Sequence, residues 1–197
     1  MPRKKIALLL LLLVVLCVSG GYFLYPQFFS SQQPLAPAAQ QALTLTQQSD
    51  TLQNAFKRML ALGYTAEDIH YNTEQSPDII GASGILDAAI IPPADSLAIP
   101  TATWALGGGQ LVGQISEDTS DTAFYLSGIK ESACRALNAA LWGDAPDALP
   151  VATNTTEEDW RTKKATILQL FQGNDRPKGC IATRDKQYVY YTVVQTR

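Results

Sequence analysis

Histidine and long runs of charge are nearly absent from this sequence of 197 residues. Its one histidine, His70, has no nucleophile-elbow motif elsewhere in the chain to pair with, so a Ser-His-acid triad has no local signature here. Charged residues make up only 17% of the chain, whereas hydrophobic residues make up 46%. That composition supports one buried core and leaves little room for two globular domains.

Basic residues are also in short supply beyond the first five positions. Arg3, Lys4 and Lys5 are three of the 15 Lys and Arg residues, so the remainder carries 12 basic against 18 acidic residues. A net negative domain excludes nucleic acid as an expected partner, because phosphate binding needs a basic surface. The one short acidic run, Glu157–Asp159, is interpreted as a solvated loop or the start of a helix.

Motifs for phosphate, calcium or a transition metal are missing as well. The stretch Gly107–Gly113 has neither a Gly-Lys-Ser/Thr ending nor the dinucleotide fingerprint, and a turn or bulge between strands is the better interpretation. Glu117, Asp118 and Asp121 lack the ligand spacing and the terminal Glu of a calcium loop. The sequence therefore predicts no cofactor, no metal and no enzymatic activity.

What the sequence does contain is a long apolar run directly after its basic start. The uncharged stretch Ile6–Leu24 has 19 residues, close to the roughly 20 that a membrane-spanning helix needs. Aromatic residues at its end are typical of a membrane interface. We expect residues 1–25 to form a basic start and a single-pass inner-membrane anchor, with the rest in the periplasm or at the cell surface. A signal peptide cleaved near Gly20 is the alternative, and it would export the same domain.

Cysteine is scarce, and its three occurrences differ in setting. Cys17 lies inside the apolar run, whereas Cys134 and Cys180 belong to the part that we expect to be exported. An even pair of cysteines in an oxidising compartment predicts one disulfide. The alternative, a pair of metal ligands, lacks a nearby histidine or a close cysteine partner.

Hydrophobic periodicity predicts one amphipathic helix after the anchor. Residues 26–41 are uncharged and contain proline, which indicates a semi-rigid linker. Apolar residues at alternating spacings of three and four then predict a helix over Ala42–Leu62, with Gly63 as its C-terminal cap. A short helical turn is expected at Thr65–Asp68. Irregular or short-stranded structure is expected over Ile79–Pro100.

The second half of the chain predicts an antiparallel sheet and one more helix. Ala102–Ile115 is expected to form two strands around its three glycines, and Ala123–Ile129 a further strand. The pattern of Glu131–Trp142 predicts a helix with its cysteine turned toward the core. Cys180–Thr183 and Tyr188–Val194 predict a hairpin, and the aromatic and β-branched last strand is expected to lie centrally in the sheet.

Taken in order, these features resemble type IV pilins and pilin-like proteins, and their layout is nearest to type IVb pilins and minor pilins (pseudopilins). Thr103–Gly109 is similar to the Trp/Phe-Gly-Gly turn that enters the pilin sheet. Ala123–Leu137 is similar to the strand leading into the first disulfide cysteine. The resemblance implies an α+β domain over residues 42–197, in which an amphipathic helix packs on an antiparallel sheet and the Cys134–Cys180 disulfide closes the C-terminal region.

The resemblance also implies a function. It implies a non-enzymatic component of a cell-envelope, surface-fibre or secretion assembly, with the membrane and other envelope or pilus-assembly proteins as partners. The chain departs from the family at its start, because it has no Gly before a Phe-Thr-like start and no acid within its apolar segment. The alternative is a membrane-anchored periplasmic binding or hydrolytic domain with its site around His70, Tyr71 and the Asp118/Asp121 turn.

Overall fold

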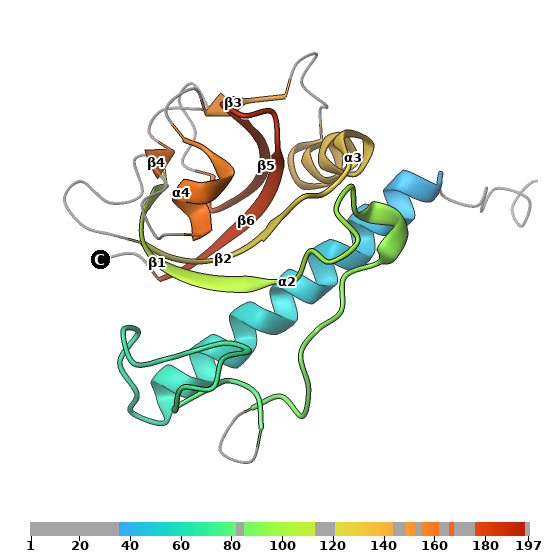
Figure 1. Cartoon of the computed structure of the whole chain (residues 1–197). Coiled ribbons are helices and arrows are strands. Elements are labelled where there is room, and N and C mark those ends of the chain that lie inside the picture. The colour runs from blue at the N-terminus through green and yellow to red at the C-terminus, as the bar shows by residue number, and fades with distance from the viewer. Residues whose placement is uncertain are drawn as a thin grey trace, which may run out of the picture. The chain divides into compact units, whose positions relative to one another are not determined.

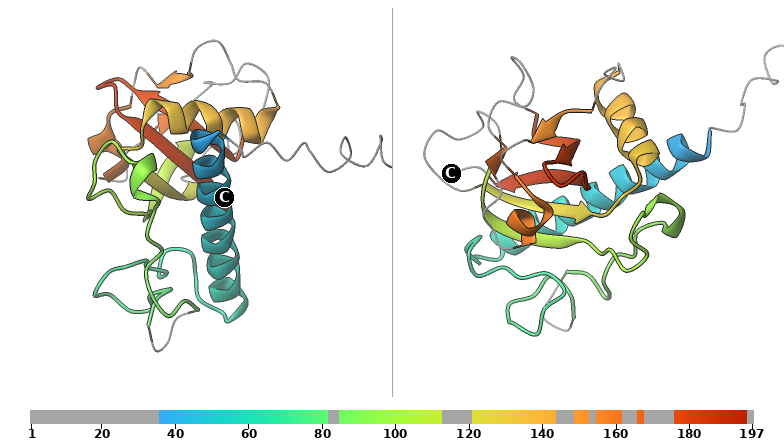
Figure 2. Two further views of the ribbon diagram at one scale, coloured as in Figure 1. Left: turned by 90° about the vertical axis from the view of Figure 1, so that its right-hand side faces the viewer. Right: turned by 45° about the horizontal axis from the view of Figure 1, so that its top comes forward.

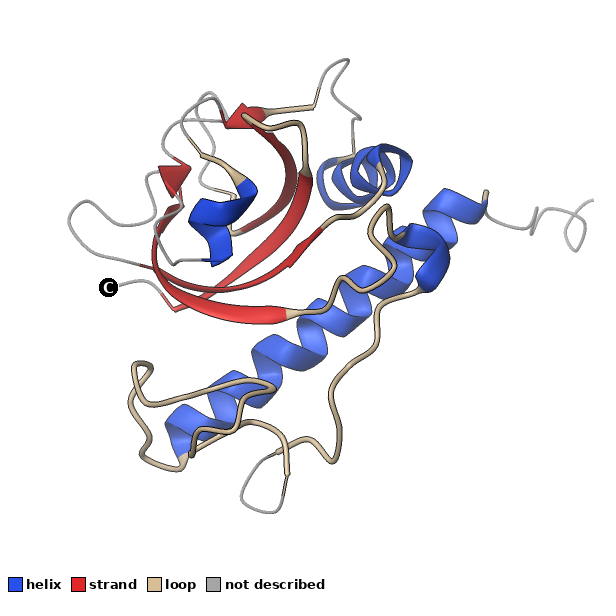
Figure 3. Cartoon of the chain, in the orientation of Figure 1, coloured by secondary structure: helices blue, strands red, loops and turns tan. Residues whose placement is uncertain are grey.

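The computed structural model has an α+β architecture, as the sequence predicted (Figures 1 and 3). It describes residues 36–81, 85–112, 121–143, 149–152, 155–161, 166–167 and 176–195. Its helical elements are α2 (Pro37–Ala61), the 3₁₀ turn η1 (Ala94–Ser96), α3 (Glu131–Trp142) and α4 (Glu157–Arg161). Its strands are β1 (Ala105–Val112), β2 (Asp121–Ser127), β3 (Val151–Ala152), β4 (Thr166–Ile167), β5 (Lys178–Thr183) and β6 (Tyr188–Gln195).

The sheet has the strand order β3-β5-β6-β2-β1-β4. The pairs β1–β2, β2–β6 and β5–β6 are antiparallel, and the predicted central position of the last strand is confirmed. The two-residue strands β3 and β4 instead pair in parallel with β5 and β1, so the prediction of a wholly antiparallel sheet is wrong at both edges. Parallel pairing needs a long connection, and long connections separate both of these pairs along the chain.

Strand β1 runs through the three glycines that were expected to separate two strands. Its pairing with β2 shifts register between Gly108 and Gln110, which face Thr122 and Asp121 respectively. The prediction of two strands around a turn is therefore wrong. Glycine suits a bulge as well as a turn. Pairing with β2 selects the bulge, so the glycines accommodate a bulge-like irregularity within one strand.

Helix α2 begins at Pro37 rather than at the predicted Ala42, so it overlaps the end of the predicted linker over residues 26–41. Proline is accepted there because N–H groups in the first turn have no intrahelical partner. The helix ends before Gly63, whose φ of +95° is the left-handed conformation of a helix cap. The predicted stripe is buried up to the end of the helix, whereas its last member, Gly63, is exposed. The buried members are Ala42, Leu45, Ser49, Leu52, Phe56 and Met59, with Ala55 beside them.

Helix α2 packs against one face of the sheet, and α3 crosses the N-terminal part of α2 (Figure 2). Phe124, Leu126 and Tyr190 join the buried residues of α2 in the larger core cluster. Tyr125 and Tyr191 belong to a second cluster on the opposite face. The strand predicted over Ala123–Ile129 is confirmed in β2, and its successive side chains point to opposite faces of the sheet.

Helix α3 has the predicted bounds, and Gly143 ends it with a φ of +80°. The predicted disulfide between Cys134 and Cys180 is confirmed, with their Cα atoms 5.3 Å apart. Neither cysteine is exposed to solvent. The bridge joins α3 to β5, so the helix and the C-terminal hairpin are held as one structure.

The connection between α2 and β1 contains little regular structure, as predicted for Ile79–Pro100. The short helical turn expected after Gly63 is present as a single turn: the Asp68 N–H donates to the Thr65 carbonyl oxygen, and the Thr65 hydroxyl donates to the Asp68 carboxylate. An isolated bridge between Leu97 and Ile129 ties the connection to the end of β2. The connection is therefore held in a defined position beside the end of β2.

From Pro37 onward the chain forms one compact unit. Within the described residues, no helix combines the length and the hydropathy needed to cross a bilayer. The predicted anchor over residues 1–25, with Cys17 in it, lies outside the described residues.

Candidate functional site

The residues proposed for an alternative site around His70 do not assemble into a catalytic group in the part of the chain that the structure describes. Tyr71 is 4% exposed, and its hydroxyl oxygen accepts a hydrogen bond from the Ile90 N–H at 2.9 Å. Asp118 lies outside the described residues, and Asp121 is the first residue of β2. Among the described residues, no group forms a hydrogen bond with the His70 imidazole.

A buried carboxylate near Tyr71 organises the backbone of the connection. Asp78 is 8% exposed, and its Oδ1 accepts hydrogen bonds from the N–H groups of Asn72 at 3.1 Å and Ile80 at 2.8 Å. Its Oδ2 accepts another from the Thr73 N–H at 2.8 Å. A buried polar group needs hydrogen-bond partners, and these three N–H donors supply them to the Asp78 carboxylate. Asp78 therefore fixes the backbone of the loop at residues 72, 73 and 80.

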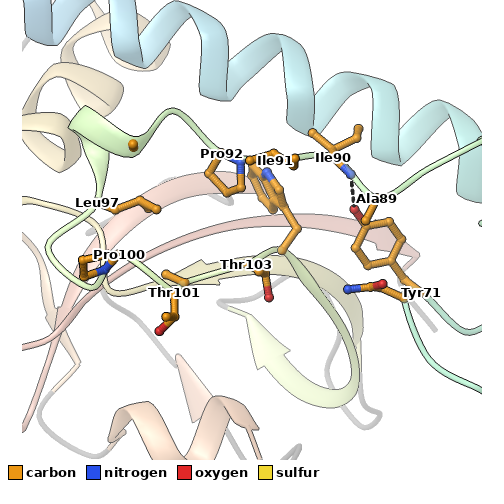
Figure 4. A pocket seen from close by; sticks show the side chains of 13 residues that line it. Tyr71, Ala89, Ile90, Ile91, Pro92, Leu97, Pro100, Thr101 and Thr103 are labelled. Atoms are coloured by element: carbon orange, nitrogen blue, oxygen red, sulfur yellow. Dashed lines mark hydrogen bonds between the residues drawn. The ribbon is translucent and has the colours of Figure 1, made fainter.

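A cavity of about 200 Å³ lies beside Tyr71 and is lined by the connection between α2 and β1 (Figure 4). Figure 4 shows Tyr71 and Pro100 at opposite ends of it. Most of its lining is apolar; principal members are Tyr71, Ile90, Pro92, Leu97, Ala102 and Trp104. An apolar cavity that is open to solvent is the usual form of a binding site, so this is the candidate functional site of the described chain.

Gln48 of α2 holds two parts of the cavity wall. Its Oε1 accepts a hydrogen bond from the Trp104 indole N–H at 3.0 Å. Its Nε2 donates to the Ile91 carbonyl oxygen at 2.9 Å. The N–H of the preceding residue, Ile90, donates to the Tyr71 hydroxyl oxygen. The backbone at residues 90 and 91 is thus fixed from both sides of the cavity.

The aromatic walls of the cavity rest on the core of the domain. Trp104 contacts Tyr190 of β6 edge-to-face, with ring centroids 5.5 Å apart. Tyr71 contacts Phe124 of β2 in the same way at 5.4 Å. The Tyr71 phenol is neutral near pH 7 like any tyrosine, and burial raises its pKa further above the usual range. The site is therefore preformed and uncharged inside.

These features suit binding of apolar groups better than bond-making chemistry. Tyr71 is the one ionisable residue in the lining, and its hydroxyl is already engaged. No three potential metal ligands gather among the described residues. The sequence placed Trp104 only in a turn entering the sheet and gave Gln48 no role. The hydrogen bonds of Gln48 join residues distant along the chain, so no local pattern signals the cavity.

The acidic run that begins at Glu157 opens helix α4, which agrees with one of its two predicted interpretations. The Thr156 N–H donates to Asp159 Oδ2, and the Asp159 N–H donates to Thr156 Oγ1. This reciprocal pair is a capping box that satisfies the first N–H groups of the helix. Glu157 also accepts a hydrogen bond from the Ser127 hydroxyl at 3.0 Å. The run has a structural role.

Known proteins offer no guide to this arrangement. No protein-family model, no curated protein and no solved structure matches the chain. The resemblance to pilin-like proteins and the function it implies therefore stay predictions.

Proposed function

We propose that this chain is a non-enzymatic, pilin-like component of a cell-envelope, surface-fibre or secretion assembly, anchored in the inner membrane by one N-terminal helix. The observation that carries the proposal is the seating of α2 along the sheet. A long helix whose one stripe is buried on a sheet, with a disulfide closing the C-terminal region, is the layout that the resemblance implies.

Polar contacts fix the position of α2 on the sheet. The hydroxyl groups of Ser49 and Tyr190 are hydrogen-bonded at 2.8 Å in the buried interface. Gln53 donates to the Val193 carbonyl oxygen at 3.2 Å. An ion pair joins Asp50 to Lys178 of β5 at the edge of the same interface. Apolar packing alone would allow the helix to slide, whereas these directional contacts favour one register.

Export is supported by the sequence and by the disulfide together. The basic residues before the apolar run favour a cytoplasmic N-terminus, so the domain would lie on the other side of the membrane. Disulfides persist in oxidising compartments such as the bacterial periplasm. The Cys134–Cys180 bridge is consistent with that location.

Fractionation of cells that produce the full-length chain tests the proposal. We expect the chain in the inner-membrane fraction, with Cys134 and Cys180 protected from thiol reagents and the domain open to protease in spheroplasts. Cross-linking should recover other envelope-assembly proteins with it. A matched variant with Arg3, Lys4 and Lys5 replaced by Glu should lose the expected orientation. A chain found in the cytosol with both thiols reactive would contradict the proposal.

A binding role at the cavity is the second candidate, and the preformed cavity beside Tyr71 is the observation that favours it. The sequence analysis suggested a binding or a hydrolytic domain with its site near His70, and a binding role at the cavity corresponds to the first of these. The hydrolytic form can be tested with a panel of hydrolase substrates on the wild type and on a His70→Ala variant. Activity that is lost in the variant would support hydrolysis, and equal inactivity of both would count against it.

A further inference from the structure

Basic residues are missing from the stretch of sequence that supplies the lining of the cavity. Between Arg58 and Lys130 the sequence contains no Lys or Arg, but it contains nine Asp and Glu residues. The connection that forms the cavity belongs entirely to this region. Its charge is therefore of one sign, and a bound group of opposite sign would be attracted to it.

Two exposed carboxylates flank residues that line the cavity. Asp95 follows Ala94, and Asp87 lies two positions before Ala89; both alanines belong to the lining. Among the described residues, neither Asp87 nor Asp95 forms an ion pair. The chain next to the lining thus carries two exposed negative charges that form no ion pair within the described part of the domain.

The rim also presents an apolar side chain to solvent. Ile91 is 83% exposed although Gln48 fixes its backbone by the hydrogen bond to its carbonyl oxygen. Ile99, farther along the same connection, is 41% exposed. A contiguous exposed apolar surface marks an interaction site, and Ile91 adds an exposed side chain to a lining that is itself mostly apolar. Here the backbone that carries Ile91 is held in place, so the side chain is displayed by a fixed structure.

The size of the cavity limits what can enter it. At about 200 Å³ it is smaller than the roughly 300–1,000 Å³ of sites that enclose drug-sized ligands. One aliphatic or aromatic side chain is a better match for that space. The acidic surroundings favour a side chain that arrives on a basic segment of chain, since opposite charges steer association and set specificity.

We propose that this cavity is a docking site for a partner protein, which inserts one aliphatic or aromatic side chain carried between lysine or arginine residues. The Tyr71 and Trp104 rings form the walls that receive the side chain, and Asp87 and Asp95 face the flanking cations. The inference deepens the proposed binding role, on which it rests, by naming the chemistry of the partner.

Short peptides provide the test on the full-length protein in a mild detergent. The probe is acetylated and amidated Lys-Lys-Leu-Lys-Lys, compared with Lys-Lys-Ala-Lys-Lys and Glu-Glu-Leu-Glu-Glu. Binding is followed by calorimetry and by the fluorine resonance of Trp104 in protein labelled with 5-fluorotryptophan, assigned with Trp104→Phe. We expect the lysine–leucine peptide to shift that resonance. The alanine peptide should bind about tenfold more weakly, since it buries less apolar surface. The acidic peptide should not bind detectably.

Two pairs of variants separate the cavity from general effects. Ala89→Phe fills the cavity and should abolish binding, whereas Ala88→Phe, at an exposed neighbour outside the lining, should not. Replacing Asp87 and Asp95 by Asn should weaken binding several-fold and reduce its dependence on salt. Replacing Glu67 and Asp68 by Gln and Asn changes the net charge equally and should have a smaller effect.

Several results would overturn the inference. Equal binding of the leucine and alanine peptides would show that binding is non-specific charge attraction. Binding by Ala89→Phe as tight as that of the wild type would show that the peptide does not enter the cavity. Tighter binding of free indole than of the peptide would indicate a small-molecule site. Self-association that Ala89→Phe abolishes would make a second copy of the chain the occupant. None of these results would alter the fractionation and cross-linking outcome, so the proposed envelope role is tested separately.

Discussion

The side-chain amide of Asn138 forms two hydrogen bonds with the backbone of Cys180. Its Nδ2 donates to the Cys180 carbonyl oxygen, and its Oδ1 accepts from the Cys180 N–H, both at 2.8 Å. Asn138 lies one helical turn after Cys134, which forms the disulfide with the same Cys180. Helix α3 thus covers the free edge of β5 at this residue, which blocks that edge from pairing with another chain.

Removal of this amide should destabilise the domain strongly. Asn138→Ala leaves the buried N–H and C=O of Cys180 without partners, and we expect the free energy of unfolding to fall by about 2–3 kcal/mol. Urea unfolding followed by circular dichroism measures the change. Ser132→Ala, at an exposed position of the same helix, is the matched control and should change stability by less than about 0.5 kcal/mol. Equal stabilities of the two variants would contradict the role of Asn138.

Reduction of the Cys134–Cys180 disulfide should also lower stability. The bridge joins residues separated by 46 positions, for which the chain-entropy relation gives a contribution on the order of 4 kcal/mol. Paired unfolding experiments with and without reductant measure it. The double variant Cys134→Ala/Cys180→Ala should match the reduced protein and should not respond to reductant. Equal free energies of unfolding for the oxidised and the reduced protein would show that the disulfide does not stabilise the domain.

The isolated hydroxyl of Thr192 offers a stabilising substitution. Its Oγ1 is buried and has no hydrogen-bond partner among the described residues. Thr192→Val keeps the shape of the side chain and removes this unsatisfied group, so we expect a gain of about 1 kcal/mol in the free energy of unfolding.

Thr183→Val is the matched control for Thr192→Val, because Thr183 is equally buried in the same sheet. Its hydroxyl donates to the Gln187 carbonyl oxygen at 2.9 Å and accepts from the Gln187 N–H at 3.1 Å. That substitution should therefore destabilise the domain. If both valine variants lose stability in urea unfolding, the hydroxyl of Thr192 has a partner and the prediction is wrong.

Buried tyrosines should make the domain sensitive to alkali. Burial raises the pKa of Tyr190 to about 12, and it also raises that of Tyr191. In the unfolded chain a tyrosine ionises near pH 10, so the contribution of Tyr190 is complete below pH 10 and is lost as the pH rises toward 12.

The measurement is the free energy of unfolding in urea at a series of pH values from about 9 to 12. Tyr190→Phe cannot ionise at that position, so its stability should fall less steeply with pH than that of the wild type. A remaining slope is expected from Tyr191 and Tyr71, because burial raises the pKa of both. Identical slopes for the wild type and Tyr190→Phe would contradict the assignment.

Elements with a strong local signal could be predicted from the sequence to within a residue or two. Helix α3 has a clear apolar face and ends at Gly143, and the aromatic and β-branched residues of β6 indicate a central strand. The disulfide followed from the expected compartment and from the even number of cysteines after residue 26. In these cases the local pattern and the packing agree.

Other features depend on contacts between distant parts of the chain. The glycines of β1 suit a turn and a bulge equally, and pairing with β2 selects the bulge. The start of α2 at Pro37 was missed, because proline usually marks a linker but is also accepted in a first helical turn. The cavity depends on the contacts of Gln48 with Ile91 and Trp104, which only the folded chain brings together.

Intact-mass spectrometry of the chain from its native membrane, after alkylation of free thiols without reductant, tests the central claim most directly. The claim is that an uncleaved N-terminal anchor retains a disulfide-closed exported domain. It predicts the 21.4 kDa chain, with or without its first methionine, carrying one alkyl group on Cys17. A mass that lacks the residues before Gly21 would show a cleaved signal peptide, and three alkyl groups would show that Cys134 and Cys180 are reduced; either result would contradict the account.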